Sequence, residues 1–205
     1  MSIKSLVKSI IYAALSRYII RKGDSSYIYI TFDDGPHPVN TLQLLKILDL
    51  YGVNAIFFMT GCEMEKYPDV VEKVVQSGHI VGYHSYAHVS VKRQSFSEFK
   101  DDLAMVHEFE KRHGIKIRLY RPPYGDLTFS VFLWLIFHRW KIVMWSIDSM
   151  DSYCDVDKII QNVEPQKINN GDIILFHDDY DKNVKLFPDL LEIYKKNNIQ
   201  CSTNL

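Results

Sequence analysis

The fold is decided by the stretch Tyr27-Ile28-Tyr29-Ile30-Thr31-Phe32-Asp33-Asp34-Gly35-Pro36. Its first six residues are β-rich and alternate in character, which predicts a strand over residues 27–32. Asp-Asp-Gly-Pro is typical of a tight turn. Two adjacent carboxylates at a strand end also repel each other unless a cation or an arginine lies nearby. The stretch is therefore interpreted as a strand that ends either in a plain turn or in a functional acidic pair.

The same alternation of strand and helix continues along the chain. Further strands are predicted at residues 53–59, 80–83, 115–120, 142–147 and 172–176, with a last candidate at 200–203. Helices are predicted at residues 41–51, 68–76, 97–112, 130–140, 156–163 and 188–196. Nearly continuous apolar strands separated by helices indicate a parallel sheet that helices cover. We therefore expect an α/β fold of about seven parallel strands, and this pattern fits a closed barrel or an open sheet.

Composition narrows the class of protein. The chain has 205 residues, of which 47% are hydrophobic, so one domain with a sizeable core is expected and disorder is excluded. The formal net charge of −1 gives no indication of a nucleic-acid partner. The three cysteines, Cys62, Cys154 and Cys201, are far apart and form no disulfide framework, which favours a reducing compartment. The sequence does not indicate an oligomeric state.

Residues 1–22 are predicted to be an amphipathic extension that precedes a catalytic domain at 23–205. Apolar residues recur at helical spacing at Ile3, Leu6, Val7, Ile10, Ile11, Ala14 and Leu15. The apolar run is too short to span a membrane and shows no clear cleavage site for a signal peptide. The segment could dock on the domain, form a basic anchor on a membrane surface, or act as a weak export signal. A cytoplasmic or peripherally membrane-associated protein is favoured.

Polar side chains follow the predicted strands at Asp33, Asp34, His84, Arg121, Asp148 and His177. The carboxyl ends of parallel strands meet at one face, where α/β proteins carry their active sites. His84 and His88 are four residues apart, so in a helix or a tight loop both imidazoles can share a metal ion, although such a pair can also be plain packing. Two histidines and one carboxylate leave open positions for water and substrate. Zn²⁺ is the expected ion, with Co²⁺, Ni²⁺ or another divalent ion possible.

Two loops that follow strands carry further candidates. Pro122 and Pro123 stiffen the loop after Arg121, and Arg121 could hold a carboxylate with two hydrogen bonds, although the loop could also be a simple turn. Trp145 and His177 also lie at strand ends, where such residues are often only structural.

Five segments carry these residues in a fixed order: Thr31-Phe32-Asp33-Asp34-Gly35-Pro36, His84-Ser85-Tyr86-Ala87-His88, Arg121-Pro122-Pro123-Tyr124-Gly125, Trp145 to Asp151, and Ile174-Leu175-Phe176-His177-Asp178. This order and spacing resemble the polysaccharide deacetylase family, carbohydrate esterase family four, which includes the nodulation chitooligosaccharide deacetylases. The resemblance covers residues 27–205. It implies a distorted (β/α) barrel and metal-dependent hydrolysis of acetyl groups on N-acetylated sugars.

The resemblance also implies a role for each matching residue. Asp34, His84 and His88 resemble the metal ligands of the family. Asp33 resembles its general base, which activates the attacking water, and Arg121 resembles the partner that holds this base. His177 resembles the general acid, with Asp151 as first choice and Asp148 as second choice for the carboxylate that keeps it protonated. The backbone N–H of Tyr124 is expected to stabilise the oxyanion, and Trp145 and Leu175 to line the acetyl pocket.

The sequence departs from the family pattern at three positions near these residues. Ser152 stands where the family often has Trp, Phe176 where it often has Leu, and Tyr83 where it often has Asn. None of these changes removes a catalytic group, but they alter the shape of the pocket. An O-acetyl esterase or a deformylase acting on a glycan or a lipid-linked sugar is therefore the alternative activity, and a binding protein without catalysis is a third possibility.

Overall fold

One eight-stranded parallel sheet organises the chain. The computed structural model describes residues 18–205, and within them the strand order is β1-β6-β5-β4-β3-β2-β8-β7. The strands are β1 (Ile19–Ile20), β2 (Tyr29–Asp33), β3 (Ile56–Met59), β4 (Ile80–Tyr83), β5 (Leu119–Tyr120), β6 (Lys141–Val143), β7 (Ile147–Asp148) and β8 (Ile173–His177). All seven neighbouring pairs are parallel, which confirms the α/β prediction.

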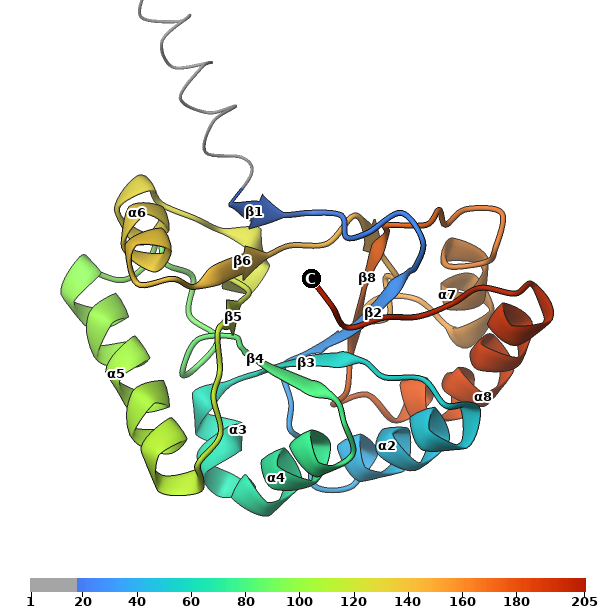
Figure 1. Ribbon diagram of the computed structural model, residues 1–205, viewed down its shortest axis with the longest axis horizontal. Coiled ribbons are helices and arrows are strands. Elements are labelled where there is room, and N and C mark those ends of the chain that lie inside the picture. Colours follow the sequence, from blue (N-terminus) through green and yellow to red (C-terminus); the bar gives the residue numbers. More distant parts are fainter. Residues whose placement is uncertain (1–17) are drawn as a thin grey trace, which may run out of the picture.

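Helices cover the outer side of this curved sheet (Figure 1). They are α2 (Asn40–Tyr51), α3 (Gly61–Lys66), α4 (Pro68–Gln76), α5 (Phe96–His113), α6 (Phe129–Phe137), α7 (Val156–Asn162) and α8 (Asp181–Lys196), with a short 3-10 helix η1 (Pro123–Gly125). The curled sheet inside a layer of helices is the distorted (β/α) barrel that was expected.

The predicted strand at 142–147 is divided in the structure. Residues 141–143 form β6, which pairs with β1 and β5, whereas residues 147–148 form β7, which pairs with β8 at the other end of the sheet. Between them the Met144 N–H donates to Ile20 O, and the Ser146 N–H donates to Ile173 O. Residues 144–146 therefore pass from one end of the sheet to the other, and the one predicted strand becomes two.

Other elements also differ from the predictions. Ile19 and Ile20, predicted to be in the N-terminal extension, form β1, so the folded domain starts before residue 23; residues 1–17 lie outside the described part of the chain. The predicted strand at 200–203 is only a single bridge between Ile28 and Cys201. Helix α3 was not predicted.

Helix α8 begins seven residues before the predicted start at Pro188. Proline is favoured in the first turn of a helix and costs about 3 kcal/mol in the interior. Here the flanking residues Leu186, Phe187, Leu190 and Leu191 are all buried against the core. Burial of each such side chain contributes about 1.5–3 kcal/mol, so together they outweigh the cost of Pro188.

Successive side chains of each strand point to opposite faces of the sheet, which creates two apolar cores. A small cluster of Tyr29, Ile56, Phe58, Leu119, Val143 and Ile173 fills the inside of the sheet, and a larger cluster lies between the sheet and the helices. In β2, Ile30 and Phe32 belong to the outer cluster. Because successive side chains of a strand point to opposite faces, Tyr29, Thr31 and Asp33 share the inner face. The sequence pattern thus places the Asp33 carboxylate inside the carboxyl end of the barrel.

Candidate active site

The predicted polar residues gather at the carboxyl ends of neighbouring strands. Asp33 ends β2 and pairs in register with His177, which ends β8. His84 directly follows β4, and its N–H donates to Met59 O at the end of β3. Since β4, β3, β2 and β8 are neighbours, their loops form one side of the barrel mouth, as the sequence predicted.

Asp34, His84 and His88 form a cluster that fits a divalent metal ion. Their ligand atoms all lie within 4.8 Å of one another. Asp34 Oδ1 is 3.3 Å from His88 Nε2 and 3.6 Å from His84 Nε2. This Asp34 oxygen is buried and accepts no hydrogen bond within the described part of the chain, which is costly for a carboxylate without a cation.

The protonation state of His84 suits a metal ligand. Its Nδ1 donates to the backbone carbonyl of Arg121 at 2.7 Å, because a carbonyl can only accept, so Nε2 carries the free lone pair. Burial lowers the pKa of His84 to about 3, which keeps the ring neutral. His84 and His88 lie in a tight loop after β4 rather than in a helix. The backbone of His88 is left-handed there, with φ of 53°.

Asp33 and Arg121 form a fully buried ion pair beside this cluster. Arg121 Nη1 donates to Asp33 Oδ1 at 2.7 Å and to Thr31 Oγ1 at 2.8 Å. The guanidinium also donates to the carbonyls of Val143 and Met144, at 3.2 and 3.1 Å. Burial raises the pKa of Asp33, and the charge of Arg121 acts in the opposite direction. Asp33 is therefore a carboxylate held in one orientation, with its second oxygen 3.6 Å from His84 Nε2.

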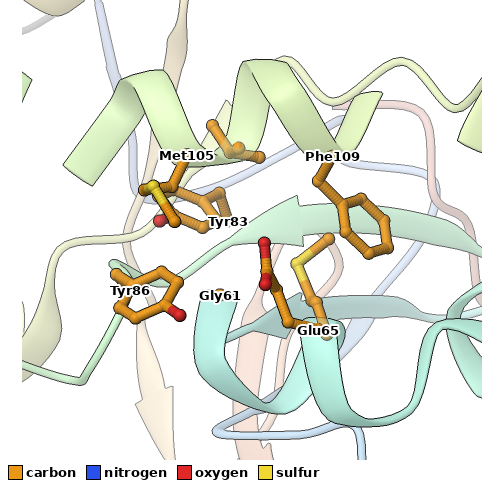
Figure 2. Close-up of a pocket in the computed structure, with 8 residues that line it drawn as sticks. Gly61, Glu65, Tyr83, Tyr86, Met105 and Phe109 are labelled. Carbon is orange, nitrogen blue, oxygen red and sulfur yellow. The ribbon is translucent and has the colours of Figure 1, made fainter. Parts of the chain in front are cut away.

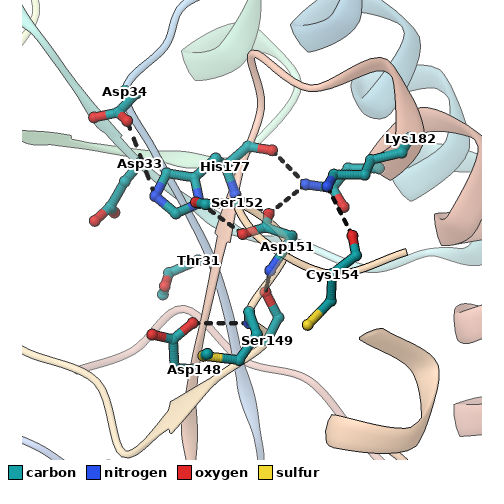
Figure 3. A network of polar contacts seen from close by, with 12 residues as sticks. Thr31, Asp33, Asp34, Asp148, Ser149, Asp151, Ser152, Cys154, His177 and Lys182 are labelled. Carbon is teal, nitrogen blue, oxygen red and sulfur yellow. Dashed lines mark hydrogen bonds and ion pairs between the residues drawn. The ribbon is translucent and has the colours of Figure 1, made fainter. Parts of the chain in front are cut away.

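His177 is paired with Asp151, the first choice from the sequence (Figure 3). Its Nδ1 donates to Asp151 Oδ1 at 2.7 Å, and its backbone N–H donates to Asp151 Oδ2 at the same distance. Burial lowers the pKa of His177, but the hydrogen bond and charge of Asp151, with Asp33 and Asp34, outweigh burial and raise it to about 9. The ring is thus protonated near neutral pH, and its Nε2 lies 3.9 Å from Asp34 Oδ2.

The remaining predicted residues lie around this centre. The Tyr124 ring packs 4.7 Å from the His88 ring and is 64% exposed, so it borders the cluster. The Trp145 ring lies 5.8 Å from the Arg121 guanidinium, and Leu175 is buried in β8. Asp148 is exposed and accepts a hydrogen bond from Met150 N–H at 2.8 Å, so this second choice is not the partner of His177.

Sequence reasoning missed two polar residues that hold this site in place. Asp178 is fully buried and hydrogen-bonds to Thr41 Oγ1, and a Cβ atom at Gly35 would lie 2.2 Å from its carboxylate. A larger residue at position 35 would therefore force the buried Asp178 carboxylate to move. Asn183 donates to Asp151 Oδ2 and, at 2.6 Å, to His177 O. Asp178 ends the last of the five quoted segments but was given no role, whereas Asn183 lies inside a helix and gives no local signal.

A separate apolar pocket lies between α3, β4 and α5 (Figure 2). Its lining is Gly61, Met64, Glu65, Tyr83, Tyr86, Met105, Val106 and Phe109. The only carboxylate among them, Glu65, forms an ion pair with Arg112 at 2.7 Å. No group there is placed for acid, base or metal chemistry, so the candidate active site is the polar cluster at the barrel mouth.

Several proteins with similar sequences or folds are named as carbohydrate deacetylases. A peptidoglycan-N-acetylglucosamine deacetylase of Bacillus cereus is 32% identical over 152 residues, which are 73% of this chain and 55% of that protein. A chitooligosaccharide deacetylase of Bradyrhizobium sp. (strain ANU 289) is 31% identical over 156 residues, which are 75% of this chain and 71% of that protein. The chain thus spans little more than half the length of the first of these relatives.

A solved structure and a family match agree with these relatives. The crystal structure of the Bc1960 peptidoglycan N-acetylglucosamine deacetylase superposes with a TM-score of 0.86 and 26% identity, covering 94% of each chain. Residues 20–136, more than half of this chain, match the family described as polysaccharide deacetylase. This match includes the whole Asp34–His84–His88 cluster, and the chain therefore belongs to the polysaccharide deacetylase family.

Proposed function

We propose that this chain is a metal-dependent hydrolase that removes acetyl groups from N-acetylated sugars, such as N-acetylglucosamine residues of an oligo- or polysaccharide. One observation carries the proposal: a buried base, Asp33, and a protonated acid, His177, each lie within 4 Å of the candidate metal ligands. Hydrolysis of an amide needs both proton transfers, because the attacking water loses a proton and the departing amine gains one.

The candidate metal site would be formed by Asp34, His84 and His88. When bound there, a divalent ion supplies Lewis-acid activation of the acetyl carbonyl and of the attacking water. Two imidazole nitrogens and one carboxylate oxygen are a donor set that Zn²⁺ accepts with an open position, so Zn²⁺ is the proposed ion and Co²⁺ and Ni²⁺ are the alternatives. Metal analysis of the purified chain decides among them.

The base and the acid have separate tasks in the proposed reaction. Asp33 takes a proton from the attacking water, and Arg121 holds the carboxylate in the orientation for this transfer. His177 gives the proton at Nε2 to the sugar nitrogen as the C–N bond breaks, while Asp151 stabilises the imidazolium. The products are acetate, which carries the oxygen of the water, and a free amine on the sugar, which carries the proton from His177.

Three further residues have proposed roles in binding the acetyl group. The backbone N–H of Tyr124 would donate to the oxyanion of the tetrahedral intermediate. Trp145 and Leu175 would form the walls around the acetyl methyl group, which explains the use of apolar side chains beside a charged centre. The names of the relatives support N-acetylglucosamine as the sugar in the substrate.

Acetate release from defined substrates tests the proposal. The full chain, loaded with Zn²⁺, should release acetate from chitooligosaccharides or from peptidoglycan, and much less from acetylated xylan. Asp33→Asn should abolish release while metal content is unchanged, whereas Asp157→Asn, an exposed change on α7, should have no effect. Release from xylan alone would instead favour the O-acetyl esterase, and release of formate from a formylated sugar would favour the deformylase.

A further inference from the structure

Helix α6 carries an exposed apolar stripe on the outside of the barrel. Phe129, Leu133 and Phe137 are 64%, 44% and 84% exposed. They are four residues apart, so they lie one above another on a single helix face. The opposite face, with Val131, Phe132 and Leu135, is buried, so α6 already contributes its share of the core. Exposed large apolar residues that line up in this way mark a surface that contacts a partner.

The two segments of the sequence next to this stripe are basic and contain no acidic residue, although one of their lysines, Lys22, is ion-paired with Asp172. Seven of the 24 Lys and Arg residues, and none of the 25 Asp and Glu residues, lie in residues 1–23 and 127–147. The rest of the chain has 17 basic and 25 acidic residues. Arg139 lies two residues after the end of α6, is exposed, and has no ion pair within the described part of the chain. A strongly basic end on a chain that is acidic elsewhere favours contact with an anionic surface.

The two basic segments are brought together by the sheet. The edge strand β1 pairs with β6 through Ile19 and Ile142, and β6 begins four residues after the end of α6 (Figure 1). The exposed Arg21 follows β1. The predicted amphipathic segment before Tyr18 therefore joins the domain beside α6, and its own basic residues are Lys4, Lys8 and Arg17.

We propose that the α6 stripe and its basic flank are a docking surface for an anionic lipid bilayer. Aromatic and aliphatic side chains enter the boundary between headgroups and acyl chains, while Arg139 and Arg21 bind the lipid headgroups. Within residues 18–205, no helix is long and apolar enough to cross a membrane. Helix α6 begins four residues after the loop with Tyr124, so the Phe129 end of this surface is the end nearer the mouth of the candidate active site.

Two other occupants fit the observations less well. Three side chains on a nine-residue helix offer too little area for a stable dimer, which needs roughly 800 Å² from each partner. Residues 1–17 could cover α6, but their charged residues are all basic, as are Arg139 and Lys141 after the helix, so this contact would place like charges together. A bilayer with anionic headgroups satisfies the apolar and the charged residues at once.

Vesicle co-sedimentation of the full chain tests this proposal independently of any catalytic activity. The chain should bind vesicles of phosphatidylcholine with about 30% phosphatidylglycerol, and raised salt should weaken the binding because screening reduces the attraction. Phe129→Ser with Phe137→Ser should weaken binding about tenfold or more, since two aromatic rings no longer leave water. Arg139→Glu should weaken binding to these vesicles and have little effect with pure phosphatidylcholine.

Helix α2, on the far side of the barrel, provides matched controls (Figure 1). Leu50 is 81% exposed and Lys46 is exposed. Leu50→Ser therefore removes an exposed apolar side chain and Lys46→Glu reverses an exposed positive charge, both away from α6, and neither should change vesicle binding. Equal binding by the wild type and the α6 variants would overturn the proposal, because residues 1–17 alone would then bind the lipid. No binding by any of them would also overturn it. A dimer that the serine variants dissociate, or a melting temperature that they lower without lipid, would identify a second copy or residues 1–17 as the occupant instead.

Discussion

Asp151→Asn should convert His177 into a neutral imidazole at the pH of the reaction. Asp151 Oδ2 accepts hydrogen bonds from the His177 N–H and from Asn183, so the amide oxygen of the new side chain stays with these two donors. Its NH₂ group then faces His177 Nδ1, where a carboxylate now accepts a hydrogen bond at 2.7 Å. A donor at this place requires a lone pair on Nδ1, which only the neutral ring has.

The size of the effect follows from the pKa of His177. Asp151, with the Asp33 and Asp34 charges, overcomes burial and raises this pKa from 6.5 to about 9, a shift that corresponds to about 3.4 kcal/mol in favour of the protonated ring. Loss of Asp151 removes the two largest causes that raise this pKa, and the new amide favours the neutral ring, so the pKa should return to about its ordinary value of 6.5. At pH 8 the protonated fraction drops from about 90% to about 3% or less, so deacetylation should slow about 30-fold or more.

The assay is the pH dependence of kcat/KM on an N-acetylated oligosaccharide and on an aryl acetate. The alkaline limb should move to lower pH in Asp151→Asn, because the acid loses its proton earlier. The aryl acetate should lose far less activity, because a phenolate leaves without being protonated. Asp148→Asn is the matched control, and its limb should stay at the wild-type position. An unmoved limb in Asp151→Asn, or equal losses on both substrates, would refute the role of His177 as the acid.

Three further predictions concern metal, packing and pH. Asp34→Ala should lose the metal, so a chelator should lower the melting temperature of the wild type but not of this variant. Gly35→Ala should destabilise the fold by about 1–3 kcal/mol in urea unfolding, because the added Cβ would meet Asp178 at 2.2 Å, and an unchanged midpoint would contradict this packing. Burial lowers the pKa of His79 from 6.5 to about 4, so the unfolded chain binds a proton first as the pH falls. Stability should therefore decline between pH 6.5 and 4, by up to about 3.4 kcal/mol, and His79→Asn should remove this part of the decline.

The sequence predicted the parts of the fold that depend on local pattern. Strand β4 and helix α4 have the predicted bounds, since apolar periodicity and a flanking Pro or Gly define them. The division of the strand at 142–147 could not be predicted, because Ser146 is the only polar residue in this otherwise apolar run. The division depends on which strands lie beside each half, and these come from distant parts of the chain.

In the candidate site, too, the residues marked by local sequence pattern could be predicted, and those placed by distant packing could not. The expected pairs Asp33–Arg121 and Asp151–His177 are present, because each residue follows a strand whose carboxyl end reaches the same face. Asn183 was not predicted, since its contact with Asp151 depends on how α8 packs. The start of α8 was itself misplaced, because a rule for isolated helices was applied to Pro188 in a helix that tertiary packing stabilises.

The Arg121 side chain contacts both the candidate general base and the backbone where β6 ends. Its guanidinium satisfies the carbonyls of Val143 and Met144 where β6 ends, and it holds Asp33 with the same group of atoms. Loss of Arg121 would leave buried carbonyls and a buried carboxylate without partners, whereas loss of Asp34 or His177 removes side chains nearer the surface. During evolutionary decay toward an inactive relative, the metal ligand or the acid can therefore disappear first, and this arginine should persist as a remnant of the chemistry for as long as the protein folds.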